Sequence, residues 1–139
     1  MAKVFVSGQI NDLSYVRAVQ AQFVASGHVI THDWTRIETG NKMLTGRQAK
    51  FDNPDEASKR ANADMTGVVD CDVYVICTNN EDMGKGMYVE LGGALALNVA
   101  TGVPKVYLLG DRKHATIFYF HPSILLRETA DEIIKEITV

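Results

Sequence analysis

Glu90 is the residue of this sequence whose type and surroundings are best suited to chemistry. It follows a glycine-bearing segment, Gly84-Lys85-Gly86, and lies near the start of a helix predicted from about Met87 to Ala100. The dipole of such a helix favours an ionised carboxylate, which is the form that a nucleophile or a charge stabiliser needs. Gly84 and Gly86 let the backbone turn and approach a ligand closely, so both are candidate substrate-binding residues. The alternative is that Glu90 only complements the helix dipole.

Small residues surround Glu90 on its side of the predicted helix. Helical spacing places Gly86 and Gly93 on the same side as Glu90, which leaves space for a substrate beside the carboxylate. Gly92 and Gly93 cost a helix interior roughly 1 kcal/mol each relative to alanine, and either close packing or a closely approaching ligand would explain that cost. The segment is not a phosphate-binding P-loop, because the GxxxxGK(S/T) pattern is absent.

Two aspartates are further candidate catalytic carboxylates. Asp64 lies on the helix predicted before the central strand, among small residues, and Asp82 lies in the polar loop that leads to Gly84. A helix that packs on a sheet can bury part of such a side chain, so Asp64 is a candidate for a partly buried acid. A solvated helix face is the alternative for Asp64.

Residues at two predicted strand ends are candidate substrate contacts. Ser7, Gly8 and Gln9 follow the first strand, and the Gln9 amide is suited to reading the edge of a base. Asp33 and Trp34 follow the second strand, where the indole could stack on a planar ligand. A turn role for Gln9 and a plain core role for Trp34 are equally open.

The elements that must position these residues alternate between strands and helices. Apolar strands are predicted at 4–7, 28–32, 73–77, 106–109 and from 124, and helices from a cap at Asp12 or Ser14 to about 26, at 54–69, at 87–100 and from about 129. The polar stretch 33–53 lacks periodicity and is either a functional loop or an ordinary surface loop. The alternation predicts one α/β domain over residues 1–139, a flavodoxin- or Rossmann-like sandwich. Its mostly parallel sheet of about five strands has helices on both faces. Ligands of such sheets bind beyond the carboxyl ends of the strands.

Composition narrows the range of partners and locations. The formal net charge is −3 and the sequence pI about 5.7, which argues against general nucleic-acid binding because that needs a basic face. No apolar run approaches the roughly 20 residues that span a bilayer, and the N-terminus has no signal-peptide pattern. A cytoplasmic protein with no membrane partner is therefore expected. Cys71 and Cys77 are expected to be reduced and buried, and the histidines show no metal-type spacing with them.

Taken in order, these segments resemble the nucleoside 2-deoxyribosyltransferase superfamily over nearly the whole domain. The most specific match is the G-x-x-x-E-L-G-x-A pattern that begins at Gly86 and contains Glu90. The other matching segments are individually less specific: the first strand with its turn, His32-Asp33-Trp34-Thr35, the Asp64 helix and the 72–77 strand.

The resemblance implies a role for each carboxylate. Glu90 would attack the anomeric carbon and form a glycosyl-enzyme, while Asp64 and Asp82 would hold the nucleoside and handle protons at the base. It also implies that no metal or cofactor is needed, and that the chain forms a homo-oligomer with sites near subunit interfaces.

Two features depart from the family pattern. Family members often carry a tyrosine in the first strand that touches the glutamate, and the matching position here is Phe5, which lacks the hydroxyl. The C-terminal tail does not match the segment that some transferases contribute to a neighbouring subunit's site. Both departures bear on transfer between bases more than on cleavage of the glycosidic bond.

The expected function is cleavage and transfer at the N-glycosidic bond of 2′-deoxynucleosides through a covalent intermediate on Glu90. The small-molecule partners would be a nucleoside or nucleotide and a free nucleobase. One alternative is a hydrolase of nucleosides or nucleoside 5′-monophosphates, in which Ser7, Gly8, Gly84 and Lys85 could contact the phosphate. The other is a non-catalytic nucleotide-binding or signalling domain, for which Glu90 would be dispensable.

Overall fold

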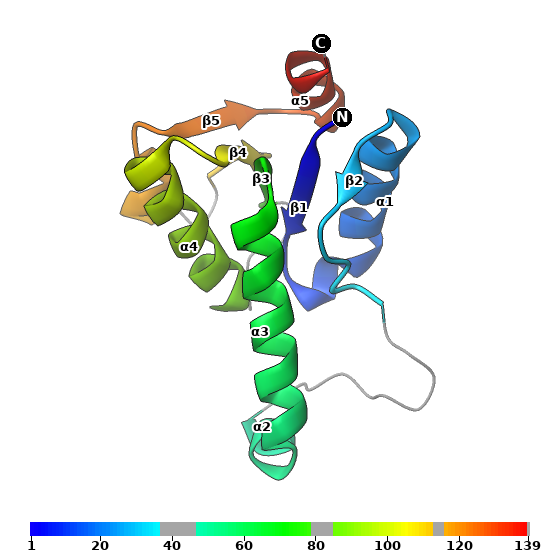
Figure 1. Cartoon of the computed structure of the whole chain (residues 1–139), viewed down its shortest axis with the longest axis vertical. Helices are drawn as coiled ribbons and strands as arrows, with labels where there is room; N and C mark the ends of the chain where they lie inside the picture. The colour runs from blue at the N-terminus through cyan, green and yellow to red at the C-terminus, as the bar shows by residue number, and fades with distance from the viewer. Residues whose placement is uncertain (37–46, 79–84, 113–115, 139) are drawn as a thin grey trace.

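The computed structural model describes residues 1–36, 47–78, 85–112 and 116–138 and contains one sheet of five parallel strands (Figure 1). The strand order is β2-β1-β3-β4-β5, and the bounds are β1 Lys3–Ser7, β2 Val29–Ile30, β3 Val73–Cys77, β4 Lys105–Leu109 and β5 Ile124–Arg127. The helices are α1 Leu13–Ala25, α2 Arg47–Asp52, α3 Pro54–Asp70, α4 Lys85–Thr101 and α5 Ala130–Ile137, with 3-10 helices η1 Ile10–Asp12 and η2 Ile117–Phe120. The expected α/β architecture is confirmed.

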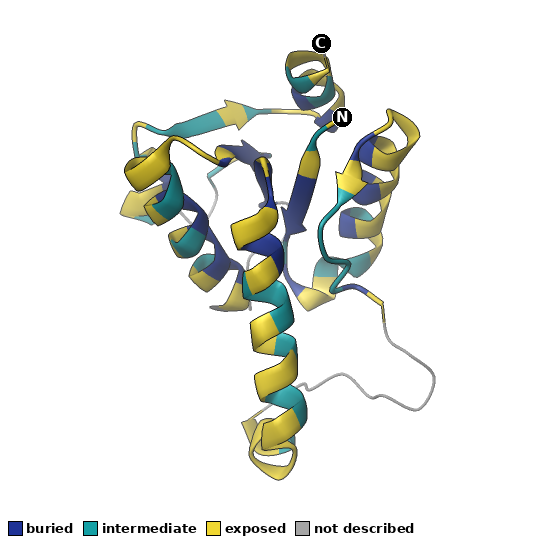
Figure 2. Ribbon diagram, in the orientation of Figure 1, coloured by how far each residue is buried: buried dark blue, intermediate teal, exposed yellow. Residues whose placement is uncertain are grey.

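Helices cover both faces of the sheet. α1 and α5 pack on one face, and α3, α4 and η2 pack on the other. Figure 2 shows buried residues concentrated in the strands and on the inward sides of the helices. β3 is buried along its whole length, as expected for the central strand of a parallel sheet that is covered on both faces.

The two faces of the sheet receive different side chains from the same strands. Val4 and Val6 of β1 belong to the apolar cluster under α1 and α5, which we call the α1 face. Phe5 of β1 and Tyr74 of β3 belong to the cluster under α3 and α4, which we call the α4 face. Successive side chains of a strand alternate between faces, and the register pairs Phe5 with Tyr74, so these two rings lie side by side.

The largest difference from the expected elements lies in the polar stretch 33–53. A short helix, α2, occupies Arg47–Asp52, and none of its residues is buried. Without a buried side there is no apolar periodicity in the sequence to indicate a helix. η1 and η2 were not expected either, since segments of three or four residues are too short for a periodic pattern. The strand expected at 28–32 is reduced to Val29–Ile30 at the sheet edge.

Two further expectations concern the thiols and the membrane. Cys71 and Cys77 are buried free cysteines, as predicted. In the described part of the chain, no helix has the length and apolar character needed to cross a bilayer.

Candidate active site

Glu90 is a buried carboxyl group where α4 meets the carboxyl end of β1. Its exposed fraction is 8%, and the hydroxyl of Ser7, the last residue of β1, donates a hydrogen bond to Glu90 Oε1 at 2.7 Å. The two residues are 83 positions apart in the sequence, so the fold and not local structure creates the contact. The contact lies at the carboxyl end of a parallel strand, where sheets of this class bind their ligands.

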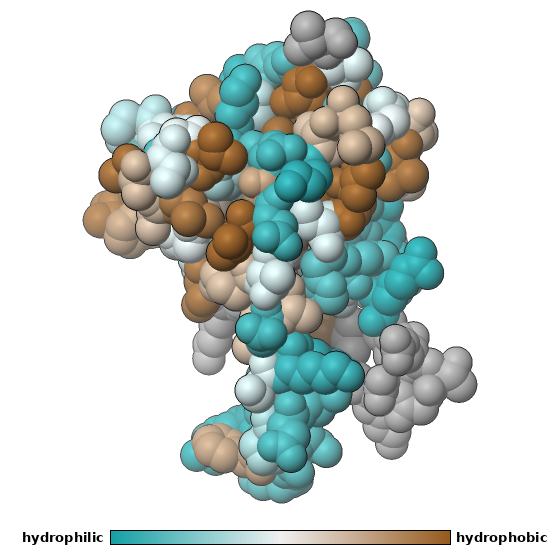
Figure 3. Space-filling model, in the orientation of Figure 1, coloured by the Kyte–Doolittle hydropathy of each residue, from teal (hydrophilic) through white to brown (hydrophobic). Residues whose placement is uncertain are grey.

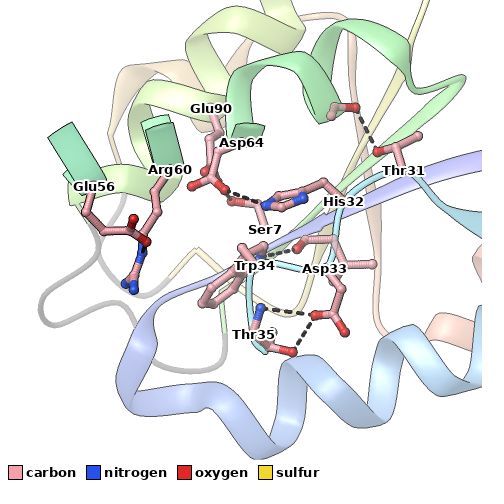
Figure 4. A network of polar contacts seen from close by, with 12 residues as sticks. Ser7, Thr31, His32, Asp33, Trp34, Thr35, Glu56, Arg60, Asp64 and Glu90 are labelled. Atoms are coloured by element: carbon pink, nitrogen blue, oxygen red, sulfur yellow. Dashed lines mark hydrogen bonds and ion pairs between the residues drawn. The ribbon is translucent and has the colours of Figure 1, made fainter. Parts of the chain in front are cut away.

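Asp64 of α3 supplies a second carboxyl group to the same place (Figure 4). The Asp64 and Glu90 carboxyls lie within hydrogen-bonding reach of each other. On the other side of Asp64, its Oδ1 lies 3.2 Å from Nε2 of His32. An ionised carboxylate only accepts hydrogen bonds, so a bond between two carboxyls requires that one of them carries a proton.

Burial sets the ionisation of this pair. Burial raises the pKa of Glu90 to about 8; the hydrogen bond from Ser7 opposes this effect, and the adjacent Asp64 charge adds to it. Burial also raises the pKa of Asp64, while His32 and Arg60 act in the opposite direction. Two adjacent carboxyls of which one is protonated and the other ionised provide both an acid and a base. That combination suits a reaction in which one group attacks while another protonates a leaving group.

Glycine residues allow the close packing that brings Asp64 into the site. A Cβ on Gly67 of α3 would lie 2.8 Å from the Cβ of His32 and 2.9 Å from the ring of Phe5, and a Cβ on Gly93 of α4 would lie 3.1 Å from Met65 Sδ. At Gly67, α3 therefore approaches the His32 segment more closely than alanine would allow, whereas at Gly93 an alanine would have to displace the end of the flexible Met65 side chain. For Gly93, close packing against Met65 therefore explains why a glycine occupies the helix interior. Gly92 instead faces open space.

Asp33 and Trp34 are held by neighbouring backbone and side chains. The carboxylate of Asp33 accepts hydrogen bonds from the Thr35 N–H at 3.0 Å, from Gln20 Nε2 at 3.2 Å and from Arg36 Nε at 3.0 Å. These partners, and not Glu90, surround it, and they lower its pKa against the opposing effect of burial. The indole of Trp34 donates to the Val6 carbonyl at 2.7 Å and packs against both apolar clusters.

The remaining predicted contacts lie around the end of β1 and the start of α4. A Cβ on Gly8 would lie 2.6 Å from Val16 Cγ2, so this glycine lets the chain leave β1 close to α1. Gln9 is buried and directly precedes η1, and Gly86 is exposed in the first turn of α4. Asp82 and Gly84 lie outside the described residues. The structure thus brings together Ser7, Asp64 and Glu90.

Two residues that the sequence did not single out complete the group. His32 contacts Asp64, and the fully buried Tyr74 donates to the Met87 carbonyl at 3.3 Å, with the Ser7 hydroxyl also within its reach. Both stand beside predicted site residues, His32 next to Asp33 and Tyr74 opposite Phe5 in the sheet register. The side chains of β3 point alternately to the two faces of the sheet, which limits Tyr74 to one of them. The strand register is also needed to place Tyr74 beside Phe5 and the site.

Comparison with known proteins bears on the fold. No protein-family model matches this sequence, and a comparison with curated proteins finds no match. The CMP N-glycosidase BcmB of Clostridium botulinum superposes with a TM-score of 0.54 and 16% sequence identity, over 96% of each chain. A conserved protein of Enterococcus faecalis V583 superposes with a TM-score of 0.48 and 19% identity, over 98% of this chain and 87% of that one. The first likeness shows that this chain has the fold of that N-glycosidase over nearly its full length.

Proposed function

We propose that this chain is a member of the nucleoside 2-deoxyribosyltransferase superfamily and cleaves the N-glycosidic bond of a nucleoside or nucleotide with Glu90 as the nucleophile. The observation that carries the proposal is the buried pair of carboxyls, in which Glu90 is held by Ser7 and lies within hydrogen-bonding reach of Asp64. The fold shared with a CMP N-glycosidase supports the reaction class.

In the first step the proton that Glu90 holds at rest moves to Asp64, which leaves Glu90 ionised. A Glu90 oxygen attacks C1′ of the sugar, the C1′–N bond breaks, and Asp64 gives its proton to the departing base. The positive charge that develops on the sugar ring in an oxocarbenium-like transition state draws the proton of the pair from Glu90 toward Asp64. The position of His32 beside Asp64 favours the return of Asp64 to its ionised form.

In the second step an acceptor attacks C1′ and releases Glu90. The ionised Asp64 takes a proton from the acceptor, and the Glu90–C1′ ester bond breaks. If the acceptor is a second nucleobase, the product is a new nucleoside; if it is water, the product is the free sugar. Exclusion of water from the site therefore decides between transfer and hydrolysis.

The contact between the carboxyls supports a covalent intermediate. Enzymes that invert the sugar configuration place a water between two carboxyls that are roughly 6.5–9.5 Å apart. Asp64 and Glu90 lie within hydrogen-bonding reach of each other, which is closer than the spacing that such a water needs. Attack by Glu90 itself, with retention after two steps, fits this geometry.

Transfer between bases is the reaction implied by the sequence resemblance, and hydrolysis of a 5′-monophosphate is the second candidate. A specific observation favours the second candidate: one solved structure that superposes over 96% of this chain is a CMP N-glycosidase. Arg60, one helical turn before Asp64, is a cation beside the carboxyl pair whose charge acts on Asp64. A substrate phosphate would compete with Glu56, whose carboxylate is 3.0 Å from Arg60 Nε.

Product analysis distinguishes these reactions. The pure protein is incubated with 2′-deoxyinosine with and without adenine, and separately with CMP and dCMP, and the products are separated by chromatography. New deoxyadenosine establishes transfer, and free base from a monophosphate establishes hydrolysis; either activity must be lost in Glu90→Ala. If no base is released from any substrate, the enzymatic proposal fails and a nucleotide-binding domain remains.

We also propose that the chain forms a homo-oligomer through the outer face of α4. Glu90 is the one charged residue between Gly86 and Thr101 in the sequence, and it points inward. On the outside, Val89 and Val99 are 64% and 67% exposed, and Figure 3 shows hydrophobic side chains gathered over α4. η2 extends this surface, because Tyr88 contacts Tyr119 with ring centroids 6.1 Å apart, and it adds the exposed Ile117, Phe118 and Phe120.

A second copy of the chain is the partner that this surface suits. A helix that is apolar on all sides is normally buried. The outer face of α4 has no charged residue between Gly86 and Thr101, so it meets its own copy across a two-fold axis without like-charge repulsion. We expect Val89→Glu with Val99→Glu to lower the mass measured by light scattering to that of one chain. Val24→Glu, at a 55% exposed valine on α1, should leave the mass unchanged. A wild-type chain that is monomeric at micromolar concentration contradicts the proposal.

A further inference from the structure

Tyr74 connects the site to the centre of the sheet. Its side chain is fully buried, and its ring stacks on Phe5 with 6.0 Å between centroids and 5° between planes. The hydroxyl lies within hydrogen-bonding reach of two acceptors, the Met87 carbonyl of α4 at 3.3 Å and the Ser7 hydroxyl. Ser7 in turn donates to Glu90 at 2.7 Å. A chain of hydroxyl groups therefore leads from β3 through β1 to the carboxyl on α4.

The hydrogens in this chain can be counted. Each hydroxyl has one hydrogen to donate, and the Ser7 hydrogen is used on Glu90. The single hydrogen of Tyr74 is donated to the Met87 carbonyl in this structure, and the Ser7 oxygen is the second acceptor within its reach. Which acceptor it prefers depends on how strongly Glu90 pulls on the Ser7 hydrogen, because hydrogen bonds in a chain polarise one another.

We propose that Tyr74 is a positioning residue that turns its hydroxyl from the Met87 carbonyl to Ser7 when Glu90 becomes ionised. With Glu90 neutral, the hydroxyl donates to Met87. With Glu90 charged, it donates to Ser7 and strengthens the bond from Ser7 to Glu90. The use of this device, to stabilise the carboxylate as it becomes a nucleophile, rests on the proposed function; the switch itself does not.

The surroundings of Tyr74 fit a donor that stays protonated. Burial raises the pKa of Tyr74 well above its usual value, and the nearby Glu90 charge acts in the same direction, so the hydroxyl keeps its hydrogen while Glu90 titrates. Hydrogen bonds to charged groups are about twice as strong as those between neutral groups, and the switch therefore favours the ionised form of Glu90. Titratable or charged groups of several packed elements face this chain: Asp64 and Arg60 from α3, His32 after β2, and Cys71 and Cys77 beside Tyr74.

The test is a titration of Glu90 by NMR in protein labelled with ¹³C at the glutamate carboxyls, with Glu90→Gln used for assignment. We expect Tyr74→Phe to raise the pKa of Glu90 by about 0.5 to 1, the difference between a charged and a neutral hydrogen bond. Tyr107→Phe is the matched control, since Tyr107 is a buried tyrosine on the α1 face whose hydroxyl lies near Glu136 and not near Glu90. It should leave the Glu90 titration unchanged.

Two further measurements isolate the path. In a Ser7→Ala background, Tyr74→Phe should have no further effect, because the relay passes through Ser7. In the wild type, the ¹³C resonance of the Tyr74 ring carbon that carries the hydroxyl should move with the same midpoint as Glu90, which needs no substitution and covers the case in which Tyr74→Phe does not fold.

The outcomes separate this proposal from the proposed function. An unchanged Glu90 titration in folded Tyr74→Phe, an equal shift in Tyr107→Phe, a shift that persists in Ser7→Ala, or a Tyr74 resonance that ignores Glu90 would each overturn the relay. Expected shifts in a protein that releases no base from any substrate would instead leave the relay standing and overturn the enzymatic function.

Discussion

The two faces of the sheet are built from the same strands but hold different chemistry. On the α1 face, β1 and β3 contribute Val4, Val6 and Val75 to a core packed against Phe23 and Ile133. On the α4 face, the same two strands contribute a ring stack, two hydroxyls and contacts to a buried carboxyl: Phe5, Ser7 and Tyr74, with Glu90 opposite them. A shift of one residue in register would exchange these sets.

The difference shows that the α1 face contributes to the stability of the fold, whereas the α4 face gives up some stability in order to hold reactive groups. Burial of apolar groups stabilises the α1 face, whereas burial of a carboxyl group costs free energy unless it is neutral or well paired. A raised pKa of Glu90, to about 8, is the sign of that cost. The comparison predicts that changes on the α4 face alter activity or its pH dependence, and that changes on the α1 face alter stability alone.

The largest expected effect is on the α4 face, at Asp64. Asp64→Asn removes the acid that protonates the departing base, and we expect base release to fall by about 10²–10⁴-fold, the range of general acid–base catalysis. Asp55→Asn, at an exposed carboxylate on the same helix, should leave the rate within twofold. Equal losses in both variants would show that the total charge of α3 matters and that the pairing of Asp64 with Glu90 does not.

The corresponding change on the α1 face should affect only folding. Phe23 of α1 is fully buried against the sheet, and Phe23→Ala is expected to lower the free energy of unfolding by about 3–5 kcal/mol, measured by urea denaturation. The kcat/KM of the folded fraction should stay within about twofold of wild type. A large loss of kcat/KM in folded Phe23→Ala would mean that the two faces are not independent.

Glu90→Gln should raise the free energy of unfolding of the protein, because it removes the buried ionisable group from the α4 face. The folded-state pKa of Glu90 is raised to about 8 from 4.5, so the native state keeps a proton that the unfolded chain releases, and wild-type stability falls as pH rises from about 4.5 to 8. Glutamine keeps the neutral, hydrogen-bonding form. We expect the variant to gain on the order of a few kcal/mol above pH 8 and almost nothing at pH 4.5. A difference that does not vary with pH would show that Glu90 titrates normally.

The smallest effect is expected at Gly67, which is a contact between α3 and the His32 segment. An alanine there would place its Cβ 2.8 Å from the Cβ of His32, and Gly67→Ala should destabilise the protein by about 1–3 kcal/mol. Because α3 carries Asp64, displacement of the helix should also reduce base release. Loss of stability with full kcat/KM would show that Asp64 reaches Glu90 without this close packing.

Local patterns were enough for the architecture and for part of the site. A nearly continuous apolar run marked β3 over Val73–Cys77, and Pro54 marked the start of α3, because both signals depend on neighbouring residues. Glu90 and Asp64 could be picked out because their helices are rich in small residues. The partners of Asp33 could not be predicted, since its carboxylate bonds to a turn and to α1.

Long-range contacts explain what the sequence left out. His32 and Tyr74 become part of the site through packing of α3 and through strand register, and neither is visible from the residues beside them in the chain. The hydroxyl expected from a first-strand tyrosine is absent at Phe5, and a hydroxyl from Tyr74 on the neighbouring strand reaches Ser7 instead. Asp82 and Gly84 remain predictions, since they lie outside the described residues.

The most direct test of the central claim is mass spectrometry of the protein quenched in acid during turnover of a nucleoside or nucleotide from which it releases the base. The account predicts that the peptide containing Glu90 gains the mass of the sugar, or of the sugar phosphate, and that Glu90→Gln shows neither the adduct nor base release. Base release by Glu90→Gln at the wild-type rate, with no adduct on the wild-type peptide, would contradict it.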